Sequence, residues 1–128
     1  MTIQEQIDYW IKLSDEDLST AEILLSNKKY VMCLYMCHLM IEKILKAHYL
    51  KNNLKNPPKT HDLLYLSSKS GIQLNNEQID FLDRLNFFQM EARYPDYKME
   101  IYKTCSKDFT NSFFNESKEF FKWIKSKI

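Results

Sequence analysis

Residues 30–50 read YVMCLYMCHLMIEKILKAHYL, and we expect the rest of the chain to be built around this stretch. It contains no glycine or proline, so a helix can run through it without a break. Apolar and aromatic side chains stand on nearly every side of that helix, which predicts that it is buried all round. Three charged residues interrupt the apolar surface: Glu42, Lys43 and Lys46. Glu42 and Lys46 are four positions apart and can pair, so the group marks either a solvated edge or a functional site.

The composition favours an all-α protein. A chain of 128 residues is about the length of one domain with its own core, and we expect a single domain over 1–128. It has one glycine and three prolines, whereas a β-sandwich or barrel would need turn residues roughly every 8–12 positions. The 18 basic and 17 acidic residues nearly cancel, so contact with nucleic acid would require a local patch of charge.

The N-terminus bears on the cellular location of the protein, and the cysteines bear on metal binding. The first ten residues, MTIQEQIDYW, are polar where a signal peptide has a basic start and an apolar core, so we expect a cytoplasmic protein. The chain has an odd number of cysteines, namely Cys33, Cys37 and Cys105, and we interpret them as reduced thiols in the core. Three residues separate Cys33 from Cys37, where c-type haem attachment has two. We therefore predict no metal and no cofactor.

Apolar residues at helical spacing predict the remaining elements. We expect further helices over about 3–25, 61–69, 76–90 and 107–127. Thr2 and Thr60 are the expected N-caps of the first and third helices. The polar turn at 26–29 makes the first two helices an antiparallel hairpin. Whether 98–106 is an irregular link or an early turn of the last helix stays open. The prediction is an antiparallel up-and-down bundle of four main helices and one short one.

The central stretch also bears on assembly. Three methionines and two tyrosines in it supply more apolar surface than one helix of a small bundle needs: Tyr30, Met32, Tyr35, Met36 and Met40. Complete coverage of such a helix by few neighbours is difficult, so the pattern predicts a subunit interface and a homodimer.

Arg93 is the first candidate for binding chemistry, because the chain has only two arginines against sixteen lysines. The planar guanidinium binds phosphate or carboxylate at two points, which lysine cannot do. Pro95 ends the preceding helix, so Arg93 and Tyr94 stand where that helix meets a loop. Either Arg93 contacts a phosphate or a partner, or it ties the loop down through Asp96 or a helix C-terminus.

His61 is the second candidate. It is the only histidine outside the central stretch, and it stands near the start of a helix, where anions bind. A general base and a residue that satisfies backbone groups are both open interpretations. His38 and His48 are interpreted as core or interface residues. The sequence contains no nucleophile elbow, Walker loop, zinc-ligand spacing or glycine-rich phosphate loop.

Several segments, taken in order, resemble the HEPN family, whose members occur beside nucleotide-binding partners. They are CHLMIEKILKA at 37–47, PKTHDL at 58–63 and RYPD at 93–96. The resemblance extends over nearly the whole chain. It implies an up-and-down helical bundle, dimerisation and often a neighbouring minimal nucleotidyltransferase, with which the HEPN protein forms a two-component, toxin–antitoxin-like system.

The resemblance also raises ribonuclease activity. Many HEPN members are metal-independent ribonucleases that use an arginine followed by a histidine after four to six residues. Arg93 matches the arginine, but the positions for the histidine hold Lys98, Met99 and Glu100. The family's catalytic histidine is therefore missing, and His61 could replace it only if the fold or a dimer partner brought it near Arg93.

The leading hypothesis is a non-catalytic HEPN module that binds a nucleotide, an RNA or a nucleotidyltransferase partner. The residues expected to line its groove are Arg93, Tyr94, Asp96, Lys43, Lys46, Glu42 and His61. The alternatives are an endoribonuclease toxin with a displaced histidine and a purely structural dimer.

Overall fold

The computed structural model describes residues 1–96 and 99–128, including all their side chains except those of 90–92. The helices in this part of the chain are α1 (Ile3–Ser26), α2 (Tyr30–Asn53), α3 (Leu63–Lys69), α4 (Asn76–Arg93), α5 (Glu100–Thr104) and α6 (Lys107–Lys125). The predicted all-α helical bundle is confirmed. Among the described helices, none is long and apolar enough to cross a membrane.

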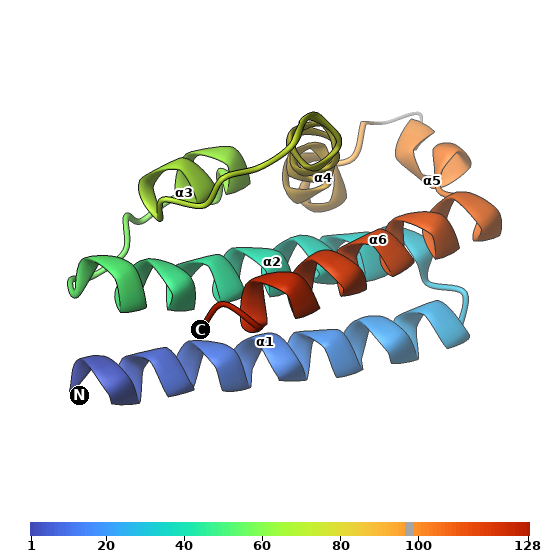
Figure 1. Cartoon of the computed structure of the whole chain (residues 1–128). Helices are drawn as coiled ribbons and strands as arrows, with labels where there is room; N and C mark the ends of the chain where they lie inside the picture. Colours follow the sequence, from blue (N-terminus) through green and yellow to red (C-terminus); the bar gives the residue numbers. More distant parts are fainter. Residues whose placement is uncertain (97–98) are drawn as a thin grey trace.

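The hairpin of α1 and α2 forms as predicted (Figure 1). Thr2 and Glu5 cap α1 reciprocally, each side chain accepting a hydrogen bond of 3.0 Å from the other's backbone N–H. The chain reverses within three residues, and Lys28 adopts a left-handed conformation with φ 61° in that turn. The two helices, of 24 residues each, then pack along their whole length.

The remaining helices build on this hairpin in two different directions. α6 runs alongside α2 in the same direction, and its C-terminal end meets the end of α2, where Lys51 donates a hydrogen bond to the Ile128 carbonyl (Figure 1). α4 instead crosses α2 and α6 and is seen almost end-on, with α3 beside it. The antiparallel relation therefore holds for α1 with α2, whereas α4 covers the α2–α6 layer crosswise.

α2 is the centre of the core. Its fully buried side chains include Leu34, Ile41 and Ile44. Across from them, Phe113 of α6 packs against Phe81 and Phe88 of α4 at centroid distances of 5.7 and 5.5 Å. Helices of the same chain thus cover most of α2. Met32 is nevertheless 39% exposed, and Tyr30, Tyr35 and Met36 are only partly buried, so the homodimer stays a prediction.

Two helix ends differ from the sequence-based expectation. α3 begins at Leu63 rather than 61, because Asp62 accepts hydrogen bonds from the N–H groups of Leu64 and Tyr65 and so acts as the N-cap in place of Thr60. α4 continues three residues beyond 90 and includes Arg93.

The segment left open, 98–106, contains the additional short helix α5. Residues 97 and 98, including the Lys98 that stands at a position of the missing histidine, lie outside the described residues.

Candidate functional site

Glu42 and Lys46 form a buried ion pair on α2. The Lys46 Nζ atom lies 3.1 Å from Glu42 Oε2, as the four-residue spacing predicted. Only 4% of Glu42 and 9% of Lys46 are exposed, so the interpretation of this group as a solvated edge is wrong for these two residues. A buried charge is costly unless it is paired, which makes each of them dependent on the other.

His61 binds the other oxygen of the same carboxylate. It lies in the loop between α2 and α3, and its Nδ1 atom is 2.7 Å from Glu42 Oε1. The side chain of His61 is 54% exposed, whereas that of Glu42 is only 6% exposed. A carboxylate acceptor fixes the orientation of an imidazole ring and holds a proton on the nitrogen that it faces. The ring's other nitrogen, Nε2, is not used by Glu42.

Trp10 of α1 covers Lys46. The Lys46 ammonium lies 5.3 Å from the centre of the indole ring, within the range of a cation–π interaction. Lys46 is thus held between a carboxylate and an aromatic ring. Its charge serves to stabilise buried Glu42, which itself orients His61.

Lys43 has a different partner. Its Nζ atom lies 2.7 Å from Asp17 Oδ2 of α1, and both side chains are largely buried. Burial raises the pKa of Asp17, and the hydrogen bond and charge of Lys43 oppose that rise. Lys43 therefore belongs to the contact between α1 and α2 and is not brought together with His61.

Arg93 lies on the same face of α2 as the Glu42 group, but farther along. Its guanidinium carbon is 5.2 Å from the centre of the Tyr35 ring. Tyr35 precedes Glu42 by seven positions, which places them on one side of the helix about 10 Å apart along its axis. The structure therefore brings Arg93 and His61 to one face without direct contact.

The two other predicted loop residues have separate environments. Tyr94 is 71% exposed immediately after the end of α4. The Asp96 carboxylate accepts a hydrogen bond of 2.9 Å from the N–H of Glu100, the first residue of α5. Asp96 thus has a local structural role.

Three residues that the sequence-based analysis did not select belong to this face: Trp10, Tyr35 and Asn86 of α4. His38 is a fourth, because its Nε2 atom lies 3.0 Å from the His61 carbonyl. The spacing of Tyr35, His38, Glu42 and Lys46 along one face of α2 is a signal that could have identified them. No comparable signal marks Asn86 or Trp10.

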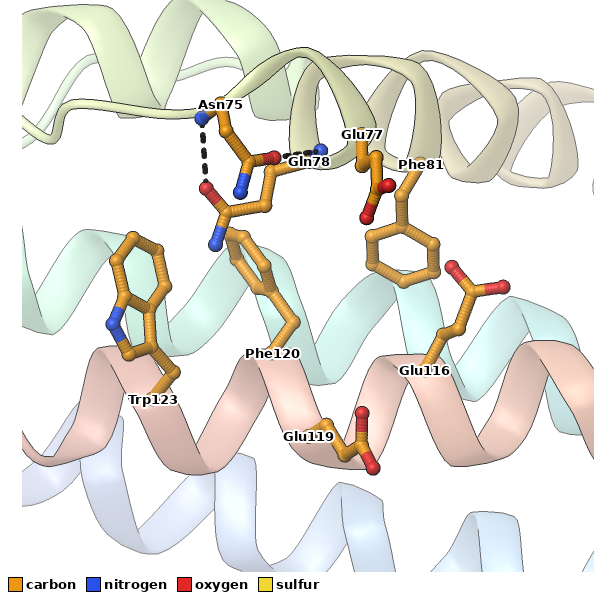
Figure 2. Close-up of a pocket in the computed structure, with 8 residues that line it drawn as sticks. All are labelled: Asn75, Glu77, Gln78, Phe81, Glu116, Glu119, Phe120 and Trp123. Carbon is orange, nitrogen blue, oxygen red and sulfur yellow. Dashed lines mark hydrogen bonds between the residues drawn. The ribbon is translucent and has the colours of Figure 1, made fainter.

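A separate hollow of about 380 Å³ lies between the start of α4 and α6 (Figure 2). Glu77 and Glu116 flank the Phe81 ring there, and Phe120 and Trp123 of α6 point toward α4. None of the predicted site residues lines it. Within the described residues, no three histidine, cysteine or acidic side chains lie close enough together to hold a metal ion.

Comparisons with known proteins agree on one relationship. The model of the HEPN domain matches residues 7–127. The crystal structure of ST0689, an archaeal HEPN homologue, is similar with a TM-score of 0.67 and 21% identity, covering 94% of this chain and 96% of that one. At this identity the structural match supports the fold and nothing further. No curated protein matches the sequence.

Proposed function

We propose that this chain, which belongs to the HEPN family, is a non-catalytic module that binds the phosphate groups of a nucleotide or an RNA. The binding face is the side of α2 between Arg93 and His61. The observation that carries the proposal is the position of the Arg93 guanidinium, 5.2 Å from the centre of the Tyr35 ring. Stacking on an aromatic face orients a guanidinium without using its N–H donors, and these donors can bind phosphate at two points.

Two further residues fit such a ligand. Tyr94 is an exposed aromatic side chain beside Arg93, and exposed aromatic rings stack on nucleobases. His61 offers its Nε2 atom at the other end of the face. Lys43 and Lys46 are committed to Asp17 and Glu42, so they contribute to the ligand site only indirectly.

The family resemblance is the basis for proposing the location, the oligomeric state and the partner of this module. We propose that it works in the cytoplasm as a homodimer beside a minimal nucleotidyltransferase, in a toxin–antitoxin-like pair. Light scattering on the purified chain tests the dimer, and co-purification with a nucleotidyltransferase encoded next to it tests the pair. A monomer at micromolar concentration contradicts the first statement, and separate elution contradicts the second.

The binding proposal is tested by thermal unfolding with a panel of nucleotides and a short single-stranded RNA. At a hundredfold excess over the dissociation constant, a ligand stabilises the folded protein by about 2.7 kcal/mol. We expect this shift for the wild type and its loss in Arg93→Ala. The matched control is Arg84→Ala, because Arg84 also lies over an aromatic ring, at 4.5 Å from Phe113, but pairs with Asp80 on another part of α4. If Arg93→Ala and Arg84→Ala showed equal thermal shifts with ligand, Arg93 would not be part of the binding site.

A second candidate function, metal-independent RNA cleavage, is favoured by the contact between Glu42 and His61. A carboxylate that orients a half-exposed imidazole is the arrangement that general acid–base catalysis uses. Arg93 would have to stabilise the phosphorane from about 10 Å farther along α2, or from a second subunit. Incubation of RNA with metal-free protein tests the activity, which His61→Ala should abolish and His48→Ala should not. Intact RNA after incubation with wild-type protein would exclude it.

A further inference from the structure

His38 is completely buried, yet it makes a polar contact with the loop that carries His61. Its Nε2 atom lies 3.0 Å from the His61 carbonyl oxygen. A carbonyl oxygen can only accept, so the proton stands on Nε2 of His38. Burial lowers the pKa of His38 to about 4, so the ring is neutral at physiological pH and its tautomer is fixed. His38 is therefore a constant hydrogen-bond donor to one backbone atom.

The same loop is held from the other side by Asn86 of α4. The Asn86 side-chain oxygen accepts a hydrogen bond of 3.0 Å from the Leu63 N–H, and its amide donates to Asp62 Oδ1 at 3.1 Å. His61 precedes these two residues directly. Its backbone is thus fixed between α2 and α4, although its side chain is half exposed.

His38 and Glu42 each hold a different part of His61. They are four positions apart on α2, so they face the same side one turn apart. His38 binds the backbone of His61 and Glu42 binds its ring. A ring on a free loop would lose its alignment with Glu42 through backbone motion, and the hydrogen bond from His38 opposes that motion.

We propose that His38 is a positioning residue for the ligand site: by donating to the His61 carbonyl it keeps the His61 ring on Glu42, with the proton on Nδ1 and with the unprotonated Nε2 presented as an acceptor to a ribose hydroxyl of the ligand. This proposal rests on the proposed function for the ligand, but the alignment of the ring is a property that can be measured without any ligand.

His48 provides a matched control. It is also a buried histidine of α2, burial also lowers its pKa, and it also bonds to a neighbouring segment, through the Ser70 hydroxyl. Ser70 lies at the end of α3, away from His61. Replacement of His48 therefore removes a comparable buried contact and leaves the His61 loop unchanged.

The experiment uses the full chain and compares wild type with His38→Met, His38→Gln and His48→Met. Nitrogen NMR of the imidazole rings reports which nitrogen of neutral His61 carries the proton, and titration with a short oligouridine RNA reports affinity. Gln can place its amide N–H near the position of Nε2, so we expect His38→Gln to keep the Nδ1 tautomer and most of the affinity. We expect His38→Met to mix the tautomers and to weaken RNA binding about tenfold, the size of effect that the loss of one hydrogen bond produces.

The outcomes separate the two proposals. An unchanged His61 tautomer in His38→Met, or a change of the same size in His48→Met, overturns the positioning role. If wild-type protein binds no RNA, the proposed function fails while the tautomer comparison still decides the role of His38. If His38→Met does not fold, His38→Asn replaces it. The shorter Asn amide stays polar but ends before the His61 carbonyl, so an unchanged tautomer in that variant overturns the proposal equally.

Discussion

The Nδ1 atom of His61 lies 2.7 Å from Oε1 of Glu42, so a carboxylate buried in the central helix orients a half-exposed ring 19 positions later in the chain. The second oxygen of the same carboxylate binds Lys46 at 3.1 Å. One buried side chain thus connects a charge-neutralising partner inside the bundle with a ring at its surface. The stability of the core and the geometry of the candidate site therefore depend on the same residue.

Removal of Glu42 should destabilise the protein mainly through Lys46. In Glu42→Ala the Lys46 ammonium is left buried without its carboxylate, which typically costs about 3–5 kcal/mol. The double variant Glu42→Ala/Lys46→Met removes the orphaned charge and should recover part of that loss. Urea unfolding measures both free energies. A double variant less stable than Glu42→Ala would show that the orphaned charge is not the cause.

Acid should destabilise the fold partly through His38. Burial lowers its pKa from 6.5 to about 4, so the unfolded chain binds a proton at a higher pH than the folded protein does. Stability is then lost as the pH falls from about 6.5 to about 4, by roughly 3 kcal/mol from this residue. His38→Gln should flatten the stability profile over that range. His48→Gln gives the contribution of the other buried histidine, whose pKa burial also lowers. A His38→Gln profile parallel to that of the wild type would contradict the assignment.

The pair of Asp17 and Lys43 gives a pH dependence of the opposite sign. Burial raises the pKa of Asp17 above 3.8, so the folded state holds its proton more tightly, and stability from this residue is lost as the pH rises through the folded pKa. Lys43 limits that rise. We therefore expect the stability deficit of Lys43→Met to grow as the pH increases above about 4 and to shrink in Asp17→Asn/Lys43→Met. A deficit that is constant with pH would mean that Lys43 acts through packing of its stem.

Phe113 should be among the most sensitive positions of the core. It is buried between α4 and α6, with the rings of Phe81, Phe88 and Phe109 within 5.7 Å of its centroid. Phe113→Ala should cost about 3–5 kcal/mol by chemical unfolding. Phe87→Ala is the control, because Phe87 is 53% exposed and should cost less than half as much. Similar losses in the two variants would contradict the assignment of the core.

Most helices of this fold could be predicted from local pattern, and the errors have local causes. The sequence predicts Thr60 as the cap of α3, but the Thr60 hydroxyl accepts a hydrogen bond from the Asp62 N–H, and Asp62 itself is the N-cap. Both residue types cap helices, so the sequence did not distinguish them. The crosswise course of α4 had no such local signal, because it depends on how α4 packs over α2 and α6.

In the candidate site, too, some contacts were predictable from local spacing and others were not. The pairing of Glu42 with Lys46 was predictable, since four residues make one turn of a helix and the partners need no tertiary contact to meet. The sequence analysis did not predict that Lys43 pairs with Asp17 and not with the Glu42 group. Lys43 follows Glu42 by one residue, so its side chain points about 100° away round the helix.

The order of neighbouring residues is enough to predict five of the six described helices, the polar turn between the first two and the family. The contacts of Glu42 and His38 with His61, and the position of Arg93 over Tyr35, became visible in the tertiary structure alone. Those contacts join residues far apart in the chain, and they form only when burial of the apolar face of α2 brings the α3 loop and the end of α4 onto it.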